Sequence, residues 1–170
     1  IKIVAQKFYD YSLYIRGYSK DTVKRYKFVI NYYCRIANVT QLEEITTDNV
    51  RDLFYYGRTA RKWSPNTSLC FQKSLVVFFR WCIQNNYMTK NPAEDVEVPK
   101  LEKRLPAKLT KQEALRLLEV IYNYPYKYKF LRYRNHAIFA TFIYAGLRKQ
   151  ELMKLRFTDI DLENFSIFIN

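Results

Sequence analysis

Three of the five prolines in this chain, Pro92, Pro99 and Pro106, fall within 15 positions. Proline lacks a backbone N–H donor and disfavours helical geometry in the residue before it, so a helix does not run through such a segment. We therefore predict a linker at residues 99–108 between a first domain, residues 1–98, and a second domain, residues 109–170.

Capping signals and apolar spacing predict that the first domain is helical. The pattern indicates helices at residues 3–14, 20–36, 47–57 and 65–85. Three of these helices have a serine or threonine at or just before their first residue, and its hydroxyl can accept a hydrogen bond from a free backbone N–H group. The expected N-caps are Ser19, Thr47 and Ser64. A bundle of four or five helices follows from this pattern.

The second domain combines helices with the first strands of a sheet. Thr110 is expected to cap a helix that runs to about residue 122, with Glu113 completing a capping box. Two further helices are predicted at residues 131–144, ended by Gly146, and at residues 148–155. Residues 160–162 and 166–169 are β-prone. The predicted fold class is mainly α, a helical bundle followed by an incomplete α+β domain.

The charge of the chain points to a polyanionic partner. It has 29 Lys and Arg against 16 Asp and Glu, a formal net charge of +13, which favours nucleic acid first and an anionic membrane surface second. The longest apolar stretch, residues 137–147, falls short of the roughly 20 residues of a membrane span. The 3 dispersed Cys and single His favour a reduced, cytoplasmic chain without a metal site.

Two of the predicted helices carry polar and basic side chains at helical spacing. One stripe runs along residues 20–31, and a second set, seven residues apart, follows Ser64. Such stripes are suited to contact the phosphates and the grooves of duplex DNA. The alternative interpretation is an ordinary solvent-exposed surface without a binding role. The predicted DNA-contacting residues are Lys20, Lys24, Arg25, Lys27, Asn31, Asn66, Lys73 and Arg80.

A tyrosine-rich loop spans residues 122–128. Exposed aromatic rings can stack on unpaired bases, so Tyr124, Tyr126 and Tyr128 are candidates for such contacts. Packing within the loop is the interpretation that the sequence favours.

Residues 144–152 read YAGLRKQEL, and residues 159–161 read DID. Gly146 permits the chain to leave one helix, and Arg148 then begins the next, where a fixed cation beside unpaired backbone donors suits a phosphate oxygen. Glu151 lies one turn further and is placed to hold the guanidinium. From the residues alone, a surface arginine or a structural pair with Glu151 is the commoner outcome.

This segment resembles the T-G-L-R-x-x-E-L segment, with a downstream D-I-D, of the tyrosine recombinase (phage integrase) family. The first domain also resembles the SAM-like core-binding bundle of that family. The matching features are Ser19, Thr22 and Tyr26; Ser64, Phe79 and Trp81; Asn91-Pro92; Pro99-Lys100; and the entry Leu109-Thr110 with Glu113. The resemblance covers nearly the whole chain in the same order.

The resemblance implies site-specific recombination of double-stranded DNA by a homotetramer on two sites, through a 3′-phosphotyrosyl intermediate and without a metal or other cofactor. It also implies that Arg148 is the first catalytic arginine and that Glu151 supports it. Ala145 stands where the family usually has Thr. Neither tyrosine nor histidine follows Arg148, so these 170 residues alone are expected to bind DNA without cleaving it.

Two alternatives stay open at this stage. A non-enzymatic DNA-binding protein, such as a shortened integrase or regulator, has the same binding features without the nucleophile. A basic helical RNA-binding module is a third class. The first residue is Ile1, which leads us to expect a portion of a longer gene product.

Overall fold

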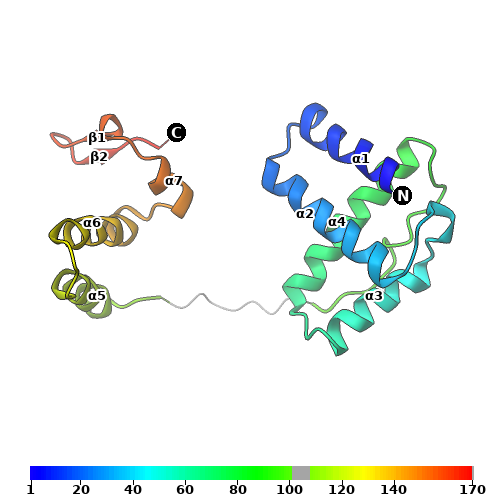
Figure 1. Ribbon diagram of the computed structural model, residues 1–170, viewed down its shortest axis with the longest axis horizontal. Helices are drawn as coiled ribbons and strands as arrows, with labels where there is room; N and C mark the ends of the chain where they lie inside the picture. The colour runs from blue at the N-terminus through cyan, green and yellow to red at the C-terminus, as the bar shows by residue number, and fades with distance from the viewer. Residues whose placement is uncertain (101–107, 170) are drawn as a thin grey trace. The chain divides into compact units, whose positions relative to one another are not determined.

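The computed structural model describes residues 1–100 and 108–169. The chain divides into two compact units, Ile1–Lys103 and Arg104–Asn170 (Figure 1). The predicted linker at residues 99–108 lies mostly outside the described residues. Within them, seven α-helices and one two-stranded sheet confirm the predicted fold class, mainly α with a small β component.

The first unit is a bundle of four α-helices in its described residues. The predicted helix at residues 3–14 is α-helical only to Asp10 and then continues with π-helical bonding. Predicted and observed bounds agree closely for the other three helices. The elements are α1 (Lys2–Asp10), the π-helix η1 (Tyr11–Ile15), α2 (Lys20–Ile36), the 3-10 helix η2 (Leu42–Glu44), α3 (Thr47–Thr59) and α4 (Pro65–Gln84).

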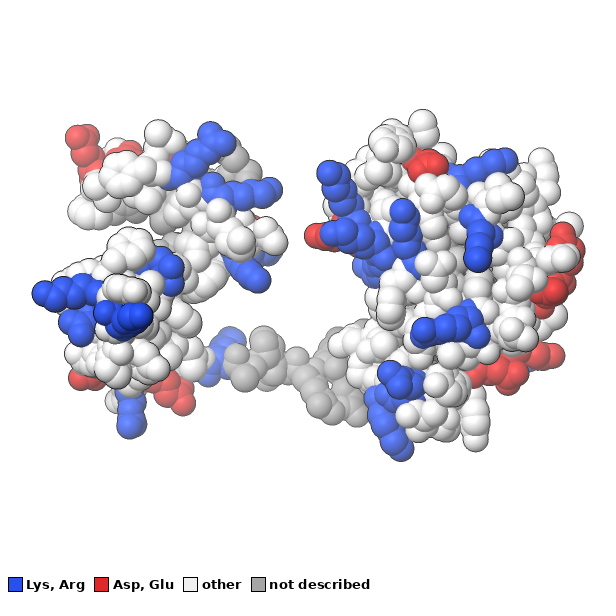
Figure 2. Space-filling model, in the orientation of Figure 1, with Lys and Arg blue, Asp and Glu red and all other residues white. Residues whose placement is uncertain are grey.

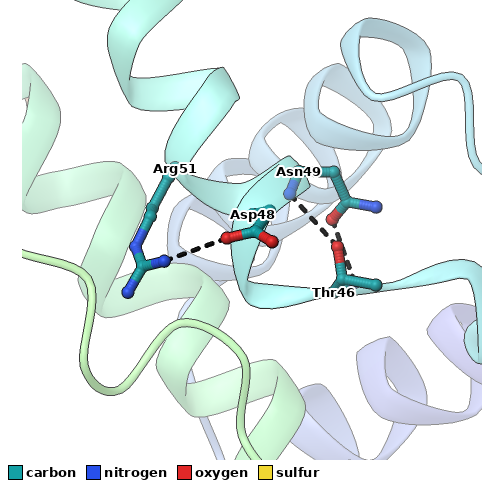
Figure 3. Close-up of polar contacts among 4 residues, drawn as sticks. All are labelled: Thr46, Asp48, Asn49 and Arg51. Atoms are coloured by element: carbon teal, nitrogen blue, oxygen red, sulfur yellow. Dashed lines mark hydrogen bonds and ion pairs between the residues drawn. The ribbon is translucent and has the colours of Figure 1, made fainter.

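Two of the three predicted N-caps in this unit are confirmed. The hydroxyls of Ser19 and Ser64 each accept a hydrogen bond from the backbone N–H three residues later, at 3.2 Å. The prediction of Thr47 as the cap of α3 is wrong, because Thr46 takes that position (Figure 3). Thr46 and Asn49 exchange bonds of 3.1 and 3.2 Å. A reciprocal box from Thr47 would instead need a polar partner at position 50, which is a buried valine.

The core of the first unit is largely aromatic and centres on α4. The Phe8 ring of α1 lies 5.3 Å from the Phe78 ring and 5.5 Å from the Trp81 ring of α4, measured between centroids. The buried Tyr33 hydroxyl donates to Asn49 Oδ1 at 2.6 Å, which ties α2 to the start of α3. These contacts fix the orientation of α2 against α4 and therefore the surface that the two helices share.

The second unit contains three α-helices, a 3-10 helix and a short hairpin in its described residues. Thr110 caps the first helix, with Glu113 completing the predicted box at 2.8 and 3.2 Å. Gly146 ends the second helix in the left-handed conformation, at φ 64°. The elements are α5 (Lys111–Asn123), α6 (Lys129–Ala145), α7 (Lys149–Lys154), the 3-10 helix η3 (Phe157–Asp159), β1 (Ile160–Asp161) and β2 (Ser166–Ile167).

The hairpin of the second unit confirms the predicted strands only in part. β1 and β2 pair antiparallel, with Ile160 opposite Ile167 and Asp161 opposite Ser166. Each strand is two residues long, shorter than the pattern suggested. Arg148 is the N-cap of α7 rather than its first helical residue.

Candidate nucleic-acid interface

A groove of about 290 Å³ lies between α2 and α4. Its cationic side chains are Arg25 from α2 and Lys73 from α4, and Asn66 near the start of α4 adds an amide. Among the residues that the structure describes, no carboxylate lines it. The remaining lining residues are Tyr26, Leu69, Cys70, Ser74 and Val77. We call this the α2–α4 groove. It brings together three of the eight residues that were predicted from the sequence to contact DNA.

The basic stripe of α2 occupies a different side of that helix. Lys27 Nζ lies 5.2 Å from the centre of the Tyr9 ring in α1, and Asn31 lines a separate cavity beside α1. Lys24 pairs with Asp21 at 3.5 Å, with both side chains largely exposed, and Lys20 is exposed at the start of the helix. The four stripe residues are therefore all accessible, but they do not line the α2–α4 groove.

Arg80 lies further along α4, in a second cavity of about 230 Å³. Val77 lines both cavities, so the second adjoins the α2–α4 groove along the helix. Arg80 Nη2 is 3.0 Å from Glu94 Oε1, and the two side chains are 59% and 55% exposed. An ion pair this exposed is weak, so Glu94 holds the Arg80 guanidinium only loosely.

Arg16 and Tyr18 are two candidate residues that the sequence analysis did not single out. Both line the cavity that contains Arg80. Arg16 Nη2 donates to the Tyr18 hydroxyl at 3.4 Å, and Gly17 between them has φ +64°, which turns the chain from η1 toward α2. The signal in the sequence was a cation and an aromatic residue flanking a glycine just before a capped helix.

Charge on the first unit favours an anionic partner for this surface. Residues 1–100 carry 16 Lys and Arg against 9 Asp and Glu, a net +7. Figure 2 shows basic side chains spread over the face of this unit on which α2 lies, with most of the acidic ones along one edge. A polyanion that approaches this face meets mainly cations.

Arg148 precedes α7 in the second unit, and Glu151 holds it at two points. The Arg148 backbone N–H donates to Glu151 Oε2 at 2.7 Å, and Nη1 donates to Oε1 at 2.8 Å. The Arg148 side chain is 86% exposed, whereas that of Glu151 is 24% exposed. These hydrogen bonds, the backbone one foremost, lower the pKa of Glu151. The rest of the exposed Arg148 guanidinium faces solvent.

Two features are absent from the described residues, a metal-binding cluster and a helix that could span a membrane. Nowhere in residues 1–100 and 108–169 do three or more His, Cys, Asp or Glu side chains gather in a way that suits a metal ion. Among the helices of the same ranges, none has the length and apolar character needed to cross a bilayer.

The first unit is thus a capped helical bundle with a cationic groove, and the second presents an exposed arginine held by a glutamate. The sequence model of the phage integrase N-terminal SAM-like domain matches residues 5–89, half of the chain. The chain therefore belongs to the tyrosine recombinase (phage integrase) family.

Curated relatives agree with this assignment. Proteins named tyrosine recombinase XerC, from Escherichia coli O1:K1 and from Escherichia coli strain K12 / DH10B, are each 33% identical over 113 residues, which is 66% of this chain and 36% of the relative. The chain thus spans about a third of the length of the curated relatives it matches. Members of this family act in site-specific DNA recombination.

Two solved structures resemble the chain. The integrase from mycobacterium phage Brujita has a TM-score of 0.51 and 17% identity, over 98% of this chain and 53% of that chain. This is a likeness of fold alone. The XerA recombinase has a TM-score of 0.46 and 22% identity, over 99% of this chain and 55% of that chain.

Proposed function

We propose that the intact protein is a site-specific recombinase that cuts and rejoins DNA strands through a 3′-phosphotyrosyl intermediate. Residues 1–98 are the core-binding domain, residues 99–108 the linker and residues 109–170 the beginning of the catalytic domain. The observation that carries this proposal is Arg148, whose exposed guanidinium Glu151 holds at 2.8 Å, in a chain of the recombinase family.

The first domain binds duplex DNA through the α2–α4 groove. Arg25 and Lys73 neutralise backbone phosphates, which fixes the register of the protein on the duplex. The Asn66 side chain carries both a donor and an acceptor, so it is suited to the edge of a base in the major groove. Arg80 adds a contact from the cavity that adjoins the groove, and Lys20, Lys24, Lys27 and Asn31 add contacts from the other side of α2.

Arg148 acts on the scissile phosphate. A guanidinium donates two parallel hydrogen bonds to non-bridging phosphate oxygens, and a donor fixed in advance stabilises the charge that develops there. Glu151 is the positioning residue that keeps this guanidinium in one orientation. The intact protein works as a homotetramer on two DNA sites in the cytoplasm, without a cofactor.

Fluorescence anisotropy with a labelled duplex tests the binding half of this proposal. We expect Arg25→Ala and Lys73→Ala each to weaken binding by about three- to tenfold, since each removes one phosphate contact. Arg51→Ala is the matched control, because Arg51 is an exposed helical arginine paired with Asp48 at 2.9 Å. Equal losses in all three variants would reject the α2–α4 groove as the binding surface.

A denaturing gel tests the part of this proposal that concerns DNA cleavage. No tyrosine follows Arg148 in the sequence, so we expect the 170-residue chain to form no covalent adduct with a nicked duplex. An adduct would show that the nucleophile lies elsewhere in the chain.

A further inference from the structure

A cluster of aromatic and basic side chains surrounds the turn between α5 and α6. Its aromatic members are largely exposed: Tyr124 by 56%, Tyr128 by 60% and Phe130 by 69%. Lys127 and Arg134 are its exposed cations. We call these five residues the α5–α6 aromatic cluster. Water-exposed rings of this size suit a partner that covers them.

Each cation of the cluster lies over a ring. Lys127 Nζ is 5.3 Å from the centre of the Tyr128 ring, and Arg134 Cζ is 5.9 Å from the centre of the Phe130 ring. Cation–π attraction of this kind holds a positive charge against one face of a ring. Since more than half of each aromatic side chain remains exposed, a second flat group has room to approach it.

The sequence around the cluster contains no acidic residue. Residues 120–150 contain six Lys and Arg and no Asp or Glu. Among the ion pairs of the described residues, none includes Lys127 or Arg134. The cluster therefore presents uncompensated positive charge beside exposed rings, which complements a ligand that is both anionic and aromatic.

Unpaired nucleotides have this chemistry, because their phosphates are anionic and the faces of their bases are free to stack. The bases of a duplex are already stacked on one another and present only their edges. The cluster thus differs from the α2–α4 groove, which offers Arg25 and Lys73 with a single tyrosine, Tyr26, that is buried.

We propose that the α5–α6 aromatic cluster is a second binding surface, specific for unpaired DNA. Bases stack on Tyr128 and Phe130, and the adjoining phosphates contact Lys127 and Arg134. The choice of DNA over RNA rests on the proposed recombinase function, in which strands are opened at the target site. The binding itself does not depend on the α2–α4 groove.

The test compares a labelled oligo-dT of about 20 nucleotides, which exceeds common site sizes, with a duplex of the same length. The Tyr128→Leu/Phe130→Leu variant of the whole chain keeps apolar bulk but removes both rings. We expect its affinity for oligo-dT to fall about tenfold or more and its duplex affinity to change less than about threefold, since stacking contributes only to unpaired bases. Tyr55→Leu is the matched control, because Tyr55 is an exposed tyrosine of α3.

Lys73→Ala separates this inference from the proposed function. It is expected to weaken duplex binding and to leave oligo-dT binding nearly unchanged, the reverse of the leucine variant. An unchanged affinity of the leucine variant for oligo-dT, or equal losses on both ligands, would overturn the second surface. Tighter binding of oligo-U than of oligo-dT would overturn the choice of DNA.

Circular dichroism checks that the leucine variant keeps its helix content. If it does not, the Lys127→Ala/Arg134→Ala variant takes its place. We expect this variant to bind oligo-dT more weakly, and the slope of log affinity against log salt to be shallower by the contribution of about two phosphate contacts. An unchanged salt dependence would likewise overturn the proposal.

Discussion

The two units of this chain both consist mainly of helices, but the helices of the first unit bury far more of their side-chain surface than those of the second. In the first unit, Leu75, Phe78 and Phe79 of α4 are at most 1% exposed. In the second unit, the 17-residue helix α6 has no buried residue, and Tyr144 remains 70% exposed. Helices in proteins owe most of their stability to burial of one face. The first unit thus has its own core, whereas the second has little.

This difference in burial indicates which of the two units is the more stable. Leu118, Ile121 and Leu147 are the buried hydrophobic residues of the second unit within the described ranges. We therefore expect the first unit to unfold as an independent, more stable body and the second to be the less stable of the two. Both Trp residues, Trp63 and Trp81, belong to the first unit, so their fluorescence reports on that unit alone.

The largest expected effect comes from truncating the core of the first unit. Leu75→Ala removes a side chain that is 0% exposed and should lower the free energy of unfolding by about 2–5 kcal/mol. Leu118→Ala, in the second unit, should leave the urea transition of tryptophan fluorescence nearly unchanged. Equal shifts in both variants would mean that the two units unfold together.

A smaller loss is expected at Gly57 of α3. A Cβ at this position would meet carbon atoms of the Trp63 ring at 2.2–2.6 Å, and that ring packs on Phe71 with centroids 4.1 Å apart. Gly57→Ala should therefore destabilise the first unit by about 1–3 kcal/mol through overpacking.

Gly17→Ala is the matched control for the Gly57 variant. The Cβ would meet nothing within 4 Å, but φ is +64°, so the cost is that of backbone conformation alone, about 1 kcal/mol. If Gly57→Ala unfolded at the same urea concentration as Gly17→Ala, the packing explanation would fail.

Local signals were sufficient to predict much of the fold. Ser19, Ser64 and Thr110 were identified as caps because the hydrogen bonds of a cap involve residues within one turn. The same logic failed at Thr47, where two adjacent threonines offered equal hydroxyls and the choice depended on Asn49. The π-helical turn at Tyr11–Ile15 had no local signal in the helical spacing.

The candidate site was predictable only where its contacts are local. Arg148 is the N-cap of α7 and Glu151 lies three residues later, so their pairing follows from the local geometry of a helix start. Which side of α2 meets α4 is decided by tertiary packing, and this is why the stripe on α2 did not identify the groove. The pairing of Arg80 with Glu94 depends on a segment that folds back on α4, where Asn91 Nδ2 donates to the Val76 carbonyl at 3.2 Å.

The two units should also respond separately to acid. The Thr40 and Gln41 N–H groups donate to Glu44 at 2.6 and 3.0 Å and lower its pKa, and the Thr110 N–H lowers the pKa of Glu113 in the same way. Because each folded pKa lies below the unfolded value, these bonds contribute fully above about pH 4.5 and are lost as the pH falls through the folded pKa.

Single glutamine variants check this acid response. Glu44→Gln should flatten the acid dependence of tryptophan-detected unfolding of the first unit. Glu113→Gln should flatten only the acid dependence of the helical circular dichroism signal that α5 contributes. A change in the tryptophan transition on Glu113→Gln would contradict the independence of the units.

The smallest expected effect is a gain in DNA affinity at the margin of the groove. Glu94→Gln removes the carboxylate that pairs with Arg80 and frees the guanidinium for a phosphate. An exposed pair of this kind is weak, so duplex affinity should rise only about two- to threefold by anisotropy. A loss of affinity would mean that Glu94 is needed to position Arg80.

The central claim, that the α2–α4 groove grips the DNA backbone, is tested most directly by the salt dependence of duplex binding. Each phosphate contact contributes about −0.9 to the slope of log affinity against log salt. We predict a steep slope for the chain and a slope shallower by about 1.8 for Arg25→Ala/Lys73→Ala. An affinity that is flat in salt, or a slope that the double variant leaves unchanged, would contradict the account.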